Sequence, residues 1–189
     1  MNFLKKRIKL SHLAVLLIIT FLVFENIFLI VQNKNLKDII NNITLNNKKS
    51  LRKPGDFIKQ IRVKDLNYVM NTLKFDEYKK NHLLFIFNTD CKHCEKNLSK
   101  WLSLFEYHDK SYCEIIAISN SDRETTLKWI KYHDIPFNVV INDDEDFKIF
   151  YVPQTILINN NGIIQGAWLG ELDSSNLDSI KSKLNRSIE

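Results

Sequence analysis

The sequence predicts an α/β domain, built on a mixed sheet covered on both faces, behind a single N-terminal transmembrane helix. Three observations support this prediction. An almost wholly apolar run at residues 10–31 follows a basic N-terminus, strand-like and helix-like segments alternate from Asp56 onward, and two strand-like runs flank an Asn/Gly turn near the C-terminus. The chain has 189 residues, which is room for one membrane anchor and one domain of ordinary size.

The N-terminal segment has the pattern of an uncleaved signal anchor. At about 1.5 Å per residue, residues 10–31 can cross a hydrocarbon core of ~30 Å as a transmembrane helix. Lysine and arginine are concentrated in the flank, residues 1–9, so we expect this flank to stay in the cytoplasm and the chain after residue 32 to lie outside the cytoplasmic membrane. A cleaved signal peptide is the alternative, but no A-x-A-like site follows the apolar run.

A polar, asparagine-rich stretch at residues 32–53 separates the anchor from the domain, and we interpret it as a stalk. It carries a weak apolar stripe at helical spacing, which could pair two stalks or pack one short helix against the domain or the membrane. Pro54-Gly55 ends this stretch. We therefore place the folded domain at residues 54–189.

The net charge of +5 does not indicate a nucleic-acid partner. Most of the excess lies in the N-terminal flank, and the remainder shows no cluster of Lys and Arg with interleaved aromatic residues. The three cysteines are too few for a disulfide scaffold. Two of them form a CxxC motif.

Segments of different periodicity follow one another in the predicted domain. Residues 83–87 form a continuous apolar run, typical of a strand buried on both faces, and apolar residues recur at helical spacing from residue 98 to 105. We further expect strands at 112–119, 137–141, 155–158 and 163–168, and helices at 121–133 (begun by a capping box, Ser121 to Glu124), at 145–150, and from Ser174 or Ser175 to about Asn185.

Cys91-Lys92-His93-Cys94 stands where a buried strand turns directly into a helix. The unpaired N–H groups and the dipole at a helix N-terminus stabilise an anion, so we expect Cys91 to be the exposed nucleophilic thiolate. Cys94, one turn on, is placed to resolve a mixed disulfide. Lys92 and His93 add positive charge or hydrogen-bond donors, which favours the reduced form, whereas the anion of Asp90 opposes thiolate formation.

A zinc site or an incidental pair of cysteines is the alternative interpretation of this motif. Zinc needs further ligands, and the candidates Cys113, His82, His108 and His133 are scattered along the chain. We therefore expect no metal and no cofactor. Cys113 lies in a strand-like segment and is expected to be a buried, inert thiol.

Two further motifs accompany the CxxC: Gly55-Asp56-Phe57 at the start of the domain, and Tyr151-Val152-Pro153-Gln154-Thr155, which is followed by Asn161-Gly162. With these motifs, residues 54–185 resemble the thioredoxin superfamily, and more closely its membrane-tethered TlpA- and ResA-like branch. The resemblance implies a thioredoxin-like fold and a cis peptide bond before Pro153. It also implies that Val152 lends its backbone to a substrate strand.

The sequence departs from the family pattern at three positions. Asp90 stands where the family usually has Trp, Ser99 where a kinking Pro is common, and Phe85 where thioredoxin buries an acid. Proton handling at Cys94 would then use water or another acid such as Glu95. These departures leave the redox potential and the direction of electron flow open.

The resemblance implies a thiol–disulfide oxidoreductase on the outer face of the cytoplasmic membrane. It would reduce specific client proteins, of the cytochrome c or metal-centre maturation type, with electrons from a transmembrane donor. A disulfide-forming oxidase is the alternative within this class, because Lys92-His93 favours the reduced form. A copper chaperone using both cysteines and a histidine is a non-enzymatic alternative. Thr89-Asp90-Cys91 also resembles part of a peroxidase motif, without its proline.

Overall fold

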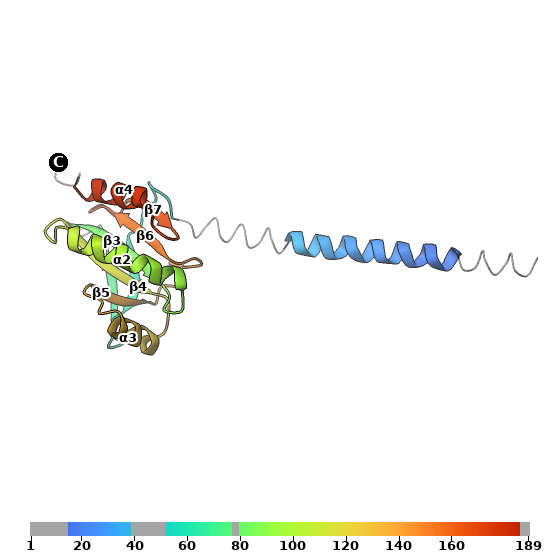
Figure 1. Cartoon of the computed structure of the whole chain (residues 1–189), viewed down its shortest axis with the longest axis horizontal. Coiled ribbons are helices and arrows are strands. Elements are labelled where there is room, and N and C mark those ends of the chain that lie inside the picture. Colours follow the sequence, from blue (N-terminus) through green and yellow to red (C-terminus); the bar gives the residue numbers. More distant parts are fainter. Residues whose placement is uncertain (1–14, 39–51, 77–79, 186–189) are drawn as a thin grey trace, which may run out of the picture. The chain divides into compact units, whose positions relative to one another are not determined.

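The first element of the computed structural model is a helix at Val15–Asp38. The structure describes residues 15–38, 52–76 and 80–185, and the chain divides into two units, Met1–Lys49 and Ser50–Glu189, which are drawn in Figure 1. Part of the predicted anchor (residues 10–14) and most of the predicted stalk (residues 39–51) lie outside the described residues. The helix runs seven residues beyond the predicted end of the anchor at Val31.

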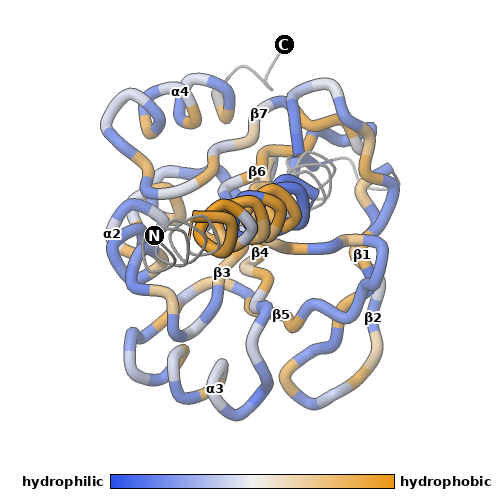
Figure 2. Tube along the Cα trace, turned by 90° about the vertical axis from the view of Figure 1, so that its right-hand side faces the viewer, coloured by the Kyte–Doolittle hydropathy of each residue, from blue (hydrophilic) through white to orange (hydrophobic). Residues whose placement is uncertain are grey.

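The N-terminal helix is apolar along most of its length (Figure 2), and its apolar side chains are exposed. It is the one helix among the described residues that is long and apolar enough to cross a membrane. Two of its polar residues satisfy a donor locally: the Thr20 hydroxyl donates to the Leu17 carbonyl at 2.9 Å, and the Asn26 amide donates to the Leu22 carbonyl at 2.8 Å. Such internal pairing is what a helix needs in hydrocarbon, where no water replaces a missing partner.

The second unit is built on one seven-stranded sheet in the order β2-β1-β5-β4-β3-β6-β7. Strands β3, β4 and β5 are parallel, and the other pairs are antiparallel, so the sheet is mixed as predicted. The strands are β1 (Gln60–Lys64), β2 (Met70–Lys74), β3 (Asn81–Phe87), β4 (Cys113–Ser119), β5 (Asn138–Asn142), β6 (Gln154–Ile158) and β7 (Ile164–Leu169), and the helices are α2 (Lys92–Tyr107), α3 (Arg123–Tyr132) and α4 (Ser174–Asn185).

Side chains of the fully buried central strand β3 alternate between two hydrophobic clusters, one on each face of the sheet. Phe85 belongs to the first cluster and Leu84 to the second. Helices α2, α3 and α4 all contribute to the first cluster, for example through Trp101, Trp129 and Ile180. Among the described residues, no helix contributes to the second cluster. Both faces are therefore covered, one by helices and the other by segments between the elements.

Ile58, Phe75 and Phe147 are buried on the second face and lie outside any strand or helix. The prediction of a helix at residues 145–150 is wrong, because this stretch is not helical in the structure. The Asp144 carboxylate accepts the N–H groups of Asp146 at 2.9 Å and Phe147 at 3.3 Å. A side chain that takes the N–H groups just after it favours a turn over a helix.

Helix α3 begins one residue later than the predicted capping box implies. Its N-cap is Asp122, whose carboxylate accepts the Thr125 N–H at 3.0 Å, and Ser121 lies outside the helix. The predicted hairpin is confirmed as β6–β7. Its turn contains Gly162 with φ +78°, and a Cβ there would meet the Ile58 carbonyl oxygen at 2.7 Å, so only glycine fits.

Candidate active site

Cys91 is the N-cap of helix α2, at the point where the chain leaves strand β3. Its sulfur accepts the backbone N–H of Cys94 at 3.3 Å, and the same N–H also donates to the Cys91 carbonyl at 2.9 Å in the first turn of the helix. The side chain is partly exposed. An anionic sulfur at this position would thus be stabilised by a backbone donor while remaining accessible to a reactant.

Cys94 has the opposite surroundings. It is fully buried in the first cluster, and burial raises the pKa of its thiol, with a further increase from its hydrogen bond to Cys91. A backbone hydrogen bond from Asn88 lowers the pKa, and the charge of Asp90 adds a smaller increase. The two cysteines are therefore chemically unequal, with an accessible sulfur at the helix start and a protonated thiol behind it.

The predicted cis peptide bond is confirmed between Val152 and Pro153. Strand β6 begins directly after Pro153 and pairs antiparallel with β3, with Gln154 opposite Ile86. This register carries both motifs to the same end of the sheet. As a result, the Cys91 sulfur lies 3.8 Å from the Val152 carbonyl oxygen.

His93 of the CxxC motif faces a partner that the sequence did not predict. Lys92 and His93 are exposed, and His93 Nδ1 lies 2.6 Å from Oε1 of Glu171, in the segment after β7. The Lys96 ammonium donates to the same oxygen at 3.1 Å. The hydrogen bond from His93, followed by that from Lys96, lowers the pKa of Glu171. Glu171 belongs to no sequence motif. Its negative charge, opposite to that of Lys96, is the only feature of the sequence that could have suggested this contact.

Glu95 was predicted as a possible acid for Cys94, and its carboxylate lies 4.0 Å from His133 Nε2. Its role in proton transfer stays a prediction. Cys113 is buried as predicted, and burial raises the pKa of its thiol to about 12. It pairs with Asn81 at the start of β3, about 20 Å along the strands from the CxxC end. Direct exchange between Cys113 and the CxxC pair is therefore excluded in the folded domain.

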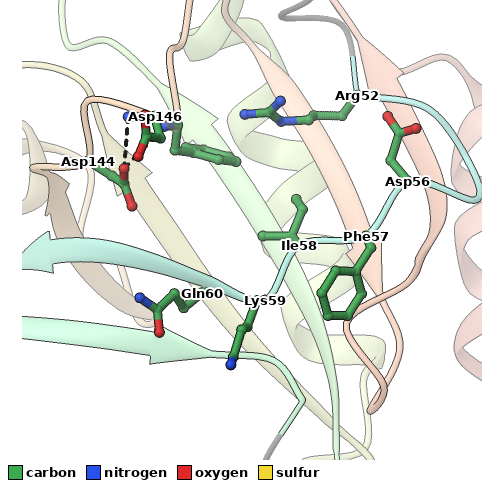
Figure 3. Close-up of a pocket in the computed structure, with 9 residues that line it drawn as sticks. Arg52, Asp56, Phe57, Ile58, Lys59, Gln60, Asp144 and Asp146 are labelled. Atoms are coloured by element: carbon green, nitrogen blue, oxygen red, sulfur yellow. Dashed lines mark hydrogen bonds between the residues drawn. The ribbon is translucent and has the colours of Figure 1, made fainter.

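The described residues contain no group of three or more His, Cys, Asp or Glu side chains positioned to hold a metal ion. A hollow of about 400 Å³ lies elsewhere, between the segment that precedes β1 and the loop after β5 (Figure 3). There the Arg52 guanidinium lies 4.7 Å from the centre of the Phe147 ring. No cysteine or histidine lines this hollow, so we assign no redox chemistry to it.

Comparisons with solved structures identify this arrangement with a known fold. The thioredoxin domain of a thiol-disulfide oxidoreductase from Bacteroides vulgatus has a TM-score of 0.59 at 21% identity, covering 71% of this chain and 99% of that one. StoA from Bacillus subtilis gives 0.54 at 15% identity, covering 67% and 98%. A peroxiredoxin-like protein from Aquifex aeolicus gives 0.57 at 11% identity, covering 72% and 88%.

These similarities confirm the thioredoxin-like fold predicted from the sequence. No curated protein sequence matches the chain significantly. The AhpC/TSA family matches residues 54–167, which include the CxxC motif, the cis-proline segment and the strands that bring them together. This protein therefore belongs to the AhpC/TSA family.

Proposed function

We propose that this protein is a membrane-tethered, extracytoplasmic thiol–disulfide oxidoreductase that reduces disulfides of client proteins through Cys91 and Cys94. The observation that carries the proposal is the contrast between the two sulfurs. Cys91 is accessible at a helix N-terminus and lies 3.8 Å from the Val152 carbonyl, whereas Cys94 is buried behind it. A client strand that pairs with the backbone at Val152 and Pro153 would bring its disulfide to Cys91.

The reaction follows from these positions as two exchange steps. The Cys91 thiolate attacks one sulfur of the client disulfide, so that a mixed disulfide forms and the other client sulfur leaves as a thiolate. Cys94 then loses its proton and attacks the Cys91 sulfur. This closes the Cys91–Cys94 disulfide and releases the second client thiolate. Two electrons pass to the client, and a dithiol donor must reduce the pair again before the next cycle.

The membrane location rests on the N-terminal helix, whose length and composition suit a single span. The basic flank predicts that the N-terminus stays inside and that the catalytic domain, proposed from residue 54 onward, lies outside. Because that compartment is oxidising, a reductase there needs a transmembrane electron donor. Clients of the cytochrome c or metal-centre maturation type would suit such a location.

The first test uses single-cysteine variants of the full chain in detergent, with insulin as a disulfide substrate and dithiothreitol as the electron source. Cys91→Ser should lower insulin reduction at least 100-fold, because no other accessible thiol lies at this site. Cys94→Ser should retain the first step and accumulate mixed disulfides, visible as a mass shift on non-reducing gels. Cys113→Ser is the control and should behave as the wild type. Undiminished activity of Cys91→Ser would refute the mechanism.

The direction of electron flow is decided by the reduction potential of the Cys91–Cys94 pair. A value near or below about −250 mV supports a reductase, and a value of about −120 to −180 mV supports the alternative, a disulfide-forming oxidase or isomerase. Peroxide consumption by Cys94→Ser would instead indicate a peroxidase. Tight Cu(I) binding by the reduced protein, without exchange activity, would indicate the copper chaperone.

A further inference from the structure

We propose that Glu171 is a positioning residue that neutralises His93 and Lys96 beside the CxxC motif and thereby keeps the Cys91–Cys94 pair reducing. The inference rests on the proposed function, because it concerns the redox potential of the same pair. Two basic side chains share one carboxylate oxygen of Glu171. His93 Nδ1 lies 2.6 Å and Lys96 Nζ lies 3.1 Å from Oε1 of Glu171.

The backbone on either side of Glu171 is fixed by a buried side chain. Asn97 is fully buried in helix α2. Its amide nitrogen donates to the Gly170 carbonyl at 3.0 Å, and its amide oxygen accepts the Leu172 N–H at 2.7 Å. One side chain thus holds both neighbours of Glu171. The carboxylate is presented to the first turns of α2 by a fixed support, whereas an ordinary surface ion pair depends on two mobile side chains.

The same segment is joined to the cis-proline motif. The Gly170 N–H donates to the Pro153 carbonyl at 2.8 Å, and Gly170 has φ +86°, a conformation that glycine adopts without strain. The segment that carries Glu171 therefore contacts the cis-proline motif through Gly170 and the CxxC helix α2 through Asn97. Its position relative to Cys91 is set by the same hydrogen bonds that hold the cysteine helix against the cis-proline strand.

The direction of the effect follows from charge. In the proposed reaction the attacking thiolate is the accessible Cys91 sulfur, and cations near the start of α2 stabilise that thiolate and with it the reduced form. Stabilising the reduced form makes a dithiol pair a stronger oxidant. Glu171 compensates His93 and Lys96, so it removes much of this stabilisation. Lys96, together with His93 when it is protonated, would otherwise favour an oxidase, and Glu171 makes the motif compatible with a reductase.

The test measures the reduction potential of the full chain in detergent, equilibrated in glutathione buffers and read out by thiol alkylation and mass spectrometry. Glu171→Gln keeps the size of the side chain and removes its charge. We expect the equilibrium to shift three- to tenfold toward the dithiol form, which is about 15 to 30 mV in the oxidising direction. Glu171→Asp should restore most of the wild-type value. Glu106→Gln makes the same charge change at an exposed site on helix α2, which also carries His93 and Lys96. This control should shift the equilibrium less than twofold.

A second comparison separates positioning from a general charge effect. In the His93→Gln/Lys96→Gln background, Glu171→Gln should change the equilibrium less than twofold, because the cations that it compensates are gone. The inference is wrong if Glu171→Gln matches Glu106→Gln, or if its effect persists without His93 and Lys96. If the wild-type pair forms no reversible disulfide at all, the proposed function itself fails, and the inference fails with it.

Discussion

His82 is a buried histidine in the second position of strand β3, at the end of the strand remote from the CxxC motif. It is 2% exposed, packs edge-on against Phe75 with 5.0 Å between ring centres, and lies 3.7 Å from the Glu114 carboxylate on β4. Burial lowers the pKa of His82 to about 4, below the usual value of about 6.5. The folded domain therefore holds this imidazole neutral.

This gives a pH dependence of stability with a defined sign. Because the pKa of His82 is lower in the folded state, its neutral form contributes fully above about pH 6.5, and that contribution is lost as the pH falls toward 4. Between pH 7 and pH 4.5 the wild type should lose about 2 kcal/mol more than His82→Gln. Urea unfolding of both proteins in detergent at the two pH values measures this difference. Equal losses would show that His82 titrates normally.

The sequence predicted that Cys91 and Cys94 lie at the start of a helix and that a cis bond precedes Pro153, and the structure confirms both. The catalytic role of the two cysteines stays a prediction, and the residues around them were not predicted. Cys91 and Cys94 were predicted from their spacing after a buried strand, and the cis bond before Pro153 was predicted from a family motif. The antiparallel pairing of β3 with β6 brings these residues together. Glu171 could not be predicted, because it lies 78 residues from His93 in a segment without a motif. Asn97 looks like any polar helix residue until its two backbone partners are known.

At the scale of elements, Asn97 joins helix α2 to the segment between β7 and α4. Replacing it with alanine removes its hydrogen bonds to Gly170 and Leu172 and leaves two backbone groups without their partner. Asn97→Ala should therefore lower the free energy of unfolding by about 2–4 kcal/mol. Ser99→Ala, at an exposed site on the same helix, should stay within about 0.5 kcal/mol of the wild type. Urea unfolding is the measurement, and a neutral Asn97→Ala would show that the segment is held by other contacts.

The elements that were predicted are those with long or strongly periodic apolar patterns. Strands β3 and β4, helix α2 and the β6–β7 hairpin belong to this group. Strands β1 and β2 were missed because they are mostly polar, and only Ile61 and Val63 give β1 its alternation. The prediction of a helix at residues 145–150 was wrong for a different reason. The Asp144 carboxylate accepts hydrogen bonds from the N–H groups of Asp146 and Phe147, which lie where that helix would begin.

At the scale of the whole molecule, the orientation across the membrane decides whether Cys91 can meet extracytoplasmic clients. A variant that keeps only Cys91, with Cys94→Ser and Cys113→Ser, should react with a membrane-impermeant maleimide on intact cells. The partial exposure of Cys91 makes it reactive there. The control carries Asn2→Cys as its single cysteine and should be labelled only after permeabilisation, because the basic flank is expected inside. Labelling of Cys91 only after permeabilisation would reverse the proposed topology.

The division of the sheet into a helix-covered face and a face covered by irregular segments has an evolutionary consequence. Cys94 is embedded in the helix-covered face, whereas the stretch from Asp144 to Val152, which leads into the cis proline, covers the other through Phe147. Insertions and deletions are tolerated far better in such stretches than in packed helices. We therefore expect insertions and deletions among homologues to fall in the stretch from Asp144 to Val152 rather than in helix α2.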